Sequence, residues 1–379
     1  MKIGIDCRTI LNPSSGERAG VGHYTYFLVK NLLKIDKKNQ YVLFFDYRTR
    51  DTREFTQKNV LIRHFPFSQY KSFLPFAYTH MLTSAYLIKY GLDVYHSPIT
   101  ALPLTYPRKA IITVHDLAIY KNPAWFPSQI FSTKLLVPQS LRKADRIISV
   151  SKSTRKDIQD LFNVSTKKIA VTYEGVNVEK IKHKRRKDDI RRFKLGKKYI
   201  LFVGTLEPRK NLITLIHAFK KLLVWDKRFE DYRLAIAGHK AYKSERVYEA
   251  VKELKLSNYV KFLGYVTTNE KFDLMKGATC FINPSSYEGF GLTLVEAMAL
   301  GTPVIASNVS SMPEVVGKAG VLVDPDREYD IASALRKVLG NKKLQERLRK
   351  AGPKQASKFS WERCAQETLK VYESVNKKK

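Results

Sequence analysis

The chain lacks long apolar runs and paired cysteines. No stretch of about 18 apolar residues occurs among its 379 residues, so the sequence predicts no membrane-spanning helix. The three cysteines, Cys7, Cys280 and Cys364, are far apart and form no CxxC pair. This pattern argues against a disulfide framework or a zinc site and is typical of a reducing cytoplasm. The start, "MKIGIDCRTI", is typical of a strand and not of a secretory signal, so we expect a cytoplasmic protein.

Acidic residues are also scarce. The chain has 68 Lys and Arg against 35 Asp and Glu, a net charge of +33. Such an excess favours polyanionic partners, which include nucleic acid, an anionic membrane face and phosphorylated substrates. A lysine-rich solvated surface would explain the same excess. The densest basic run, residues 180–198, has little apolar content and is typical of an exposed linker.

Apolar strand patterns alternate with helical patterns along the whole chain, which predicts an α/β fold with parallel sheets. The pattern stops at the basic run and restarts after it, so we expect two domains. Their predicted bounds are residues 1–177 for the first domain, 178–198 for the linker and 199–359 for the second domain, followed by a final amphipathic helix at 360–379. The predicted strands lie at 2–7, 40–47, 93–98, 109–116, 145–151 and 168–175, and then at 198–206, 232–238, 260–266, 279–285, 302–308 and 319–325.

Ligands bind at the carboxyl ends of parallel strands, so the residues that follow each strand are site candidates. Gly20, Val21 and Gly22 open a helical segment, where glycines let backbone N–H groups approach an anion; a tight turn is the alternative. His115 ends the strand at 109–116 and is a candidate hydrogen-bond donor or base, or else a structural histidine. His96, in a similar place, is predicted to be structural.

Two cations follow the first strand of the second domain. Pro208 confines Arg209 and Lys210 to a loop or the first turn of a helix. The planar fork of an arginine and the point charge of a lysine would together clamp a diphosphate. In so basic a chain, solvated surface residues are the alternative.

The segment "PSSYEGFGLTLVE" places Glu288 and Glu296 eight residues apart, with Gly289 and Gly291 between them. The pair would suit the acid and the nucleophile of a glycosidase, or it would hydrogen-bond sugar hydroxyls. Glu296 alone would also suit the dipole of a helix N-terminus. The glycosidase interpretation leaves the glycines and the Arg209–Lys210 pair unexplained.

Together these motifs resemble glycosyltransferase family 4, and the resemblance covers essentially the whole chain. The motifs are GVG, DVYHSP, TVHDL, ADRIISVS, YEGVN, FVGTLEPRKNL, INPSSYEGFGLTLVEAMALGTPVIAS, MPEVVGKAGVLVDP and FSW. The resemblance implies a GT-B fold, in which two Rossmann-like domains face each other across a cleft and the C-terminal helix crosses back to the first. It also implies retaining transfer of a hexose from a nucleoside-diphosphate sugar, bound by the second domain, to an acceptor bound by the first.

The resemblance also implies roles for the carboxylates and the histidine. Glu296 matches the glutamate that holds the nucleotide ribose, and Glu288 matches the one that contacts hydroxyls of the donor sugar. His115 matches a histidine near the C6 hydroxyl of that sugar.

Lys210 matches the lysine that neutralises the diphosphate. Gly20–Gly22 match the loop of the first domain that closes on that phosphate. Thr205, directly after Gly204, stands where many members of the family carry arginine, so the cationic clamp rests on Arg209 and Lys210. The residues expected to contact the diphosphate or sugar through their backbone are Phe290, Gly291 and Leu292, and the predicted donor-binding set also includes Gly204, Thr205 and Val21.

No metal or other cofactor is expected, because the only Asp-x-Asp, at Asp324–Asp326, lies in a predicted turn far from the other motifs. GDP-mannose is the favoured donor, and UDP-sugar users share nearly all of the motifs. The base would bind near Gly238 and residues 264–265. A glycoside hydrolase or a nucleic-acid-binding protein is the remaining alternative, although the usual nucleic-acid-reading motifs are absent.

The aromatic, apolar segment 65–91 lies in the predicted acceptor domain. With the positive charge, it predicts peripheral association with an anionic membrane face that carries a lipid-linked acceptor. A buried helix is the alternative.

Overall fold

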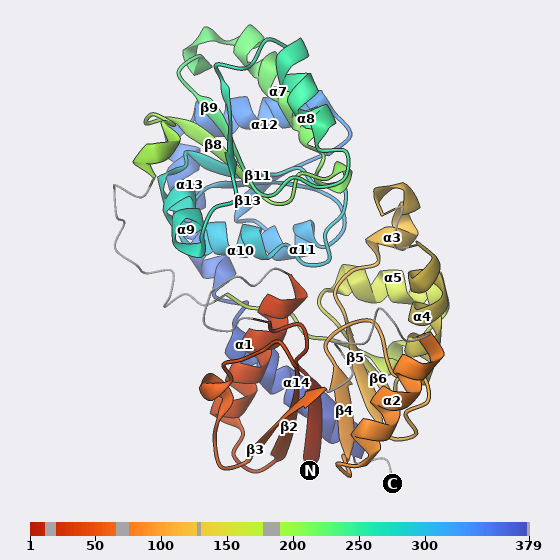
Figure 1. The fold of residues 1–379 in the computed structure, drawn as a ribbon. Coiled ribbons are helices and arrows are strands. Elements are labelled where there is room, and N and C mark those ends of the chain that lie inside the picture. The colour runs from red at the N-terminus through yellow and green to blue at the C-terminus, as the bar shows by residue number, and fades with distance from the viewer. Residues whose placement is uncertain (12–19, 66–75, 127–129, 177–189, 377–379) are drawn as a thin grey trace. The chain divides into compact units, whose positions relative to one another are not determined.

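The computed structural model describes residues 1–11, 20–65, 76–126, 130–176 and 190–376 (Figure 1). The chain divides into two compact units. Unit 1 comprises Met1–Gly175 and Ser360–Lys379, and unit 2 comprises Val176–Phe359. Most of the basic run predicted as a linker, residues 177–189, lies outside the described residues.

Unit 1 is built on a parallel sheet of seven strands in the order β3-β2-β1-β4-β5-β6-β7. Apolar runs form these strands because a parallel sheet is covered by helices on both faces. The strands are β1 (Lys2–Asp6), β2 (Gln40–Asp46), β3 (Val60–Phe65), β4 (Val94–Ser97), β5 (Ala110–Val114), β6 (Arg146–Ser149) and β7 (Ile169–Val171). The helices are α1 (Val21–Ile35), α2 (Phe76–Ile88), α3 (Ala118–Lys121), α4 (Ile130–Lys143), α5 (Lys152–Phe162) and α14 (Trp361–Asn376).

Unit 2 has a parallel sheet of six strands in the order β10-β9-β8-β11-β12-β13. The strands are β8 (Tyr199–Val203), β9 (Arg233–Ala237), β10 (Val260–Gly264), β11 (Cys280–Asn283), β12 (Val304–Ser307) and β13 (Gly320–Val323). The helices are α7 (Leu212–Trp225), α8 (Glu245–Glu253), α9 (Thr268–Gly277), α10 (Leu292–Ala299), α11 (Met312–Val316), α12 (Glu328–Leu339) and α13 (Lys342–Ala356). The predicted α/β class with two parallel sheets is confirmed.

One strand was absent from the sequence prediction. β3 pairs with β2 at the edge of the unit 1 sheet, and most of its residues are only partly buried. Arg63 and His64 interrupt its apolar pattern, so this segment does not contain the apolar run that predicts a strand.

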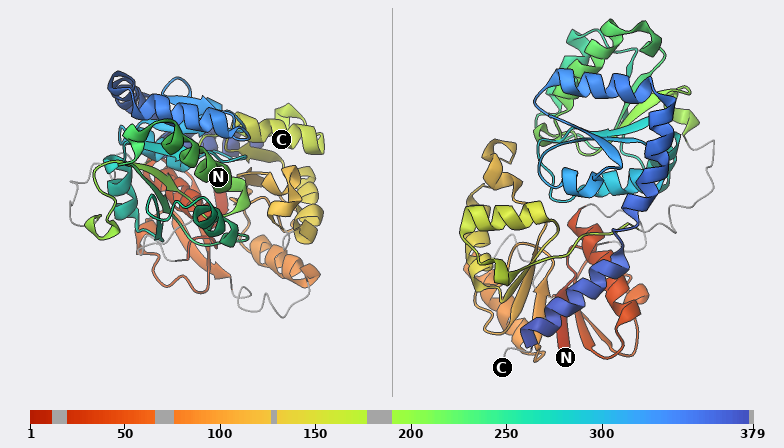
Figure 2. Two further views of the ribbon diagram at one scale, coloured as in Figure 1. Left: turned by 90° about the horizontal axis from the view of Figure 1, so that it is seen from above. Right: turned by 180° about the vertical axis from the view of Figure 1, so that it is seen from behind.

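The last helix of the chain, α14, belongs to unit 1 although it follows unit 2 in the sequence. It packs along α1, as the right-hand view of Figure 2 shows. Its first residue, Trp361, stacks on Phe27 of α1 with ring centroids 5.4 Å apart. Gly175 lies against this start: a Cβ atom there would be 2.1 Å from the backbone nitrogen of Trp361, so only glycine fits.

We therefore predict that Gly175→Ala destabilises unit 1 by about 1–3 kcal/mol, because the new methyl group would collide with the backbone at the start of α14. Thermal unfolding measures the effect. Gly91→Ala is the control, since Gly91 has φ +59° and open space around it, so its cost of about 1 kcal/mol comes from backbone strain alone. Equal melting temperatures for Gly175→Ala and the wild type would contradict the close approach.

Candidate active site

The strand order of unit 2 brings its site candidates together. β8 is the first strand of this sheet in the sequence, with β9 on one side and β11 on the other. The order reverses at this point, and such a switch point opens a crevice at the carboxyl ends of the two strands. The turn with Pro208, Arg209 and Lys210 follows β8, and the segment with Glu288 follows β11, so the two loops meet there.

Glu288 is the centre of the contacts between these two loops. Its carboxylate accepts hydrogen bonds from Lys210 Nζ at 2.7 Å and from Arg209 Nη1 at 3.0 Å. Ser285 Oγ donates to the same carboxylate at 2.8 Å, and Asn283 Nδ2 at 3.3 Å. Lys210 and Arg209 are separated from Glu288 by 78 and 79 positions in the sequence, and the three side chains form one ionic cluster.

These contacts fix the charge of Glu288. Burial raises its pKa, but the charges of Lys210 and Arg209 and the hydrogen bonds from Lys210 and Ser285 outweigh burial and lower the pKa to about 2. The carboxylate is therefore ionised at neutral pH. A group with such a pKa accepts hydrogen bonds and does not donate a proton.

The backbone between the two glutamates is held by two serines. Ser311 Oγ donates to the carbonyl oxygens of Glu288 and Phe290, both at 2.9 Å, and Ser310 Oγ accepts from the N–H of Glu288 at 3.0 Å. Gly291 then begins α10 with φ +97°, a conformation that favours glycine. Because Gly291 is the N-cap residue, it offers no side chain to cap this helix N-terminus, where backbone N–H groups favour an anion.

Glu296 lies in the second turn of α10 and is buried. Its two carboxylate oxygens accept from Lys271 Nζ of α9, at 2.6 and 2.8 Å. Both glutamates of the motif therefore have cationic partners, and these partners come from different elements.

Two glycines let the loops after β8 and β9 approach each other. A Cβ atom on Gly238 would be 1.8 Å from the carbonyl oxygen of Gly204. Thr205, which follows Gly204, is exposed. Beyond β9 and β10, the rings of His239 and Tyr265 stack with centroids 4.6 Å apart, at the place where the base was expected.

In unit 1, the GVG segment begins α1. Gly20 has φ +52° and stands before the first helical residue, Val21. A Cβ atom on Gly22 would be 2.5 Å from the carbonyl oxygen of Thr9, so this position also requires glycine. Residues 12–19, which precede the segment, lie outside the described residues.

His115 follows β5 and uses both ring nitrogens. Nε2 lies 2.9 Å from the carbonyl oxygen of Pro98, and Nδ1 lies 3.1 Å from Glu174 Oε1. Because a carbonyl only accepts, Nε2 carries a proton, and the carboxylate favours a second proton on Nδ1. Burial lowers the pKa of His115, but the hydrogen bond and charge of Glu174 outweigh burial and raise it.

The sequence did not single out Glu174, although it lies near the end of the predicted strand 168–175, within "YEGVN". His96 is fully buried between Tyr372 and Thr113, in agreement with the structural role predicted for it. Burial and the charge of His115 lower the pKa of His96 to about 3, so its ring is neutral.

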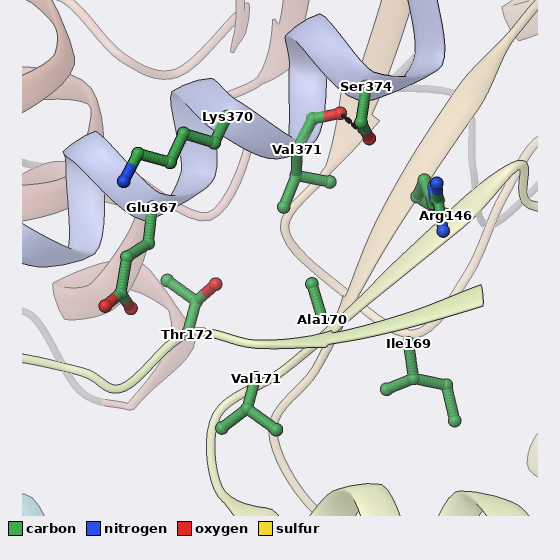
Figure 3. A pocket seen from close by; sticks show the side chains of 9 residues that line it. All are labelled: Arg146, Ile169, Ala170, Val171, Thr172, Glu367, Lys370, Val371 and Ser374. Atoms are coloured by element: carbon green, nitrogen blue, oxygen red, sulfur yellow. Dashed lines mark hydrogen bonds between the residues drawn. The ribbon is translucent and has the colours of Figure 1, made fainter. Parts of the chain in front are cut away.

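A hollow of about 340 Å³ lies on unit 1 between β7 and α14 (Figure 3). Ala170 and Thr172 of the β7 segment point toward Val371 of α14 across it. None of the predicted site residues lines this hollow.

Within the described ranges, no group of three or more His, Cys, Asp and Glu side chains is arranged to hold a metal ion. The backbone N–H of Asp326 bonds to Asp324 Oδ1, as expected of a tight turn. Independence from metal stays a prediction.

Comparison with known proteins identifies the family. The sequence matches the profile of glycosyl transferases group 1 over residues 183–355 and that of glycosyltransferase family 4 over residues 18–180. It is 33% identical to O-antigen chain mannosyltransferase B of Escherichia coli over 283 residues, which are 74% of each chain. The chain belongs to glycosyltransferase family 4. It is therefore an enzyme that transfers a sugar.

Solved glycosyltransferase structures share the fold of this family member. Sucrose-phosphate synthase from Thermosynechococcus elongatus superposes with a TM-score of 0.78 at 22% identity, over 99% of this chain and 98% of the other. Anabaena HepE, solved in complex with UDP and glucose, gives 0.73 at 17% identity over 99% of this chain and all of the other. At such identities the likeness concerns the fold, which is GT-B.

The lowered pKa of Glu288 predicts a pH-dependent stability. Ionised Glu288 stabilises the folded state above the ordinary carboxyl pKa of 4.5, and this contribution is lost as the pH falls toward 2. We expect Glu288→Gln to lower the free energy of unfolding at pH 7 by about 3 kcal/mol, and this difference to shrink as the pH falls below 4.5.

Urea unfolding followed by circular dichroism measures this difference. Glu249→Gln, at an exposed position on α8, is the control and should change stability by less than about 0.5 kcal/mol. A difference between wild type and Glu288→Gln that does not vary with pH would contradict the ionic role.

Proposed function

We propose that this glycosyltransferase moves a hexose, with mannose favoured, from a nucleoside-diphosphate sugar to a glycan or lipid-linked acceptor with retention of configuration. The observation that carries the proposal is the cluster of Arg209, Lys210 and Glu288 at the switch point of unit 2. The proposed phosphate-binding cations are thus in direct contact with the proposed sugar-binding carboxylate.

The donor would bind along the loop after β11 and the start of α10. Glu296 would accept hydrogen bonds from the ribose hydroxyls, and Glu288 from hydroxyls of the transferred sugar. The diphosphate would lie at the uncapped N-terminus of α10, near the backbone of Phe290, Gly291 and Leu292, with Lys210 as its counter-ion. The glycines of the GVG segment of unit 1, Gly20 and Gly22, would let backbone N–H groups approach an anion.

Catalysis would come from charge. Cleavage of the bond between sugar and phosphate develops negative charge on the leaving diphosphate, and fixed cations aimed at that charge lower the barrier. The acceptor hydroxyl would attack from the face that the diphosphate leaves, which retains configuration without a covalent enzyme intermediate. No metal or cofactor enters this scheme.

The ionised state of Glu288 argues against this residue as the protonated carboxylic acid that a glycosidase needs. With a pKa of about 2, Glu288 does not supply that proton at neutral pH. The nucleic-acid-binding alternative was based on net charge alone.

For His115, the resemblance implies a place near the C6 hydroxyl of the sugar. Both of its ring nitrogens already face Pro98 and Glu174. We therefore propose that these two contacts fix the orientation of its ring and that His115 does not act as a base.

The proposed base site is bordered by the stacked rings of His239 and Tyr265. Mannose is favoured because relatives named as O-antigen mannosyltransferases are 33% and 29% identical to this chain. A UDP-sugar donor is the alternative, since the neighbouring Anabaena structure contains UDP and glucose.

A donor panel tests the proposal. We expect nucleoside diphosphate to be released from GDP-mannose, faster with a glycan acceptor than without one, and the product to keep the anomeric configuration of the donor by NMR. Lys210→Met should lower kcat by about 10²–10³. Lys227→Met, an exposed lysine of unit 2, should leave kcat unchanged. Failure to release nucleotide from any sugar donor would refute the donor assignment.

We also propose peripheral association with an anionic membrane. No helix in the described part of the chain is long and apolar enough to cross a membrane. On α2, however, Met81, Ala85 and Ile88 are exposed at helical spacing, so an apolar stripe faces outward on this helix. Residues 66–75 of the predicted membrane segment lie outside the described residues.

Vesicle flotation tests the membrane proposal. At low salt the protein should float with vesicles that contain phosphatidylglycerol, and the double variant Met81→Glu with Ile88→Glu should float several-fold less because the stripe becomes charged. Val224→Glu, which changes an exposed apolar residue of unit 2, is the control. No flotation of the wild type at low salt would exclude the association.

A further inference from the structure

The N-terminus of helix α9 is fixed from two sides. Thr267 and Glu270 form a capping box, in which each side chain bonds to the backbone N–H of the other. Glu270 also pairs with Arg192 at 2.6 Å. The next residue along this anchored turn is Lys271.

Lys271 extends from α9 to the buried carboxylate on α10. Its Nζ atom lies 2.6 Å from one oxygen of Glu296 and 2.8 Å from the other. The two side chains are 19% and 7% exposed, so the pair is shielded from water. Within the described part of the chain, Lys271 is the cation that pairs with Glu296.

A buried carboxylate without a counter-ion carries a desolvation penalty of several kcal/mol. A single ammonium that bonds to both oxygens offsets part of this penalty and fixes the plane of the carboxylate. Each oxygen has two acceptor sites, so one site on each stays available to a vicinal diol. A ribose presents such a diol.

We propose that Lys271 is the positioning residue of the ribose site: it holds the carboxylate of Glu296 in the orientation in which both oxygens accept from the 2′- and 3′-hydroxyls of the donor nucleotide. The inference rests on the proposed function of Glu296. It adds a residue that the sequence motifs do not include, since Lys271 is one lysine among many and lies outside the segment from Glu288 to Glu296.

The test measures the affinity of GDP and UDP by calorimetry for four variants: Lys271→Met, Lys271→Arg, Glu296→Gln and the double variant. We expect Lys271→Met to weaken nucleotide binding about tenfold to a hundredfold. Lys271→Arg should stay within a few-fold of wild type, because it retains the charge. The double variant, Lys271→Met with Glu296→Gln, should bind nucleotide about as weakly as Glu296→Gln alone, because the lysine acts through the glutamate.

Kinetics separate positioning from a general structural effect. Lys271→Met should raise KM for the donor far more than it lowers kcat, because the ribose is remote from the bond that breaks. Lys276→Met, an exposed lysine on the same helix, is the matched control and should leave both constants unchanged. If Lys271→Met does not fold, Lys271→Gln, which removes the charge and keeps a hydrogen-bonding side chain, takes its place.

The outcomes distinguish this inference from the proposed function. If Glu296→Gln loses nucleotide affinity while Lys271→Met binds within twofold of wild type, the inference is wrong and the ribose assignment stands. If Glu296→Gln binds like the wild type, the ribose assignment is wrong and the inference falls with it. Additive losses in the double variant would also overturn the inference.

Discussion

The organisation of unit 2 depends on one constraint, the compensation of buried charge around Glu288. Arg209 and Lys210 are held against this carboxylate, and Ser285 and Asn283 donate hydrogen bonds to its Oε1 atom. A buried carboxylate is stable in the ionised form only when such partners surround it. The loop after β8 and the loop after β11 are therefore locked to each other through charge as well as through the sheet.

The sequence predicted every described strand except β3, because apolar runs are local signals. The edge strand β3 escaped because Arg63 and His64 interrupt its pattern. Glu174 and Lys271 escaped for another reason. Their partners lie 59 and 25 residues away, and in a single sequence nothing marks one acidic or basic residue as the partner of another. Local patterns likewise could not predict that Arg209 and Lys210 contact Glu288. Only the resemblance to glycosyltransferase family 4 placed these residues at one site.

Glycine has a geometric role wherever this chain brings backbone segments together. Gly238 leaves room for the carbonyl of Gly204 at the ends of β8 and β9, and Gly291 turns the chain into α10 with a positive φ. The side chains of the site are thus aimed by close backbone contacts that another residue would break. This explains why glycines and charged residues alternate in the motifs, since the glycines set the loop geometry and the charged residues supply the chemistry.

The charges within the Glu288 cluster balance, so this cluster does not account for the large positive charge of the chain. Arg209 and Lys210 supply two positive charges, while Glu288 and Glu207, which pairs with Arg209 at 2.7 Å, supply two negative ones, so these four side chains sum to zero. Glu296 is likewise matched by Lys271. The net charge of +33 therefore resides elsewhere on the protein. A diphosphate that enters the proposed site would compete with Glu288 for cations that are already paired. Selection of the diphosphate over other anions would therefore come from the geometry of the site. The excess positive charge elsewhere on the protein would act earlier, by attracting anionic partners over longer distances.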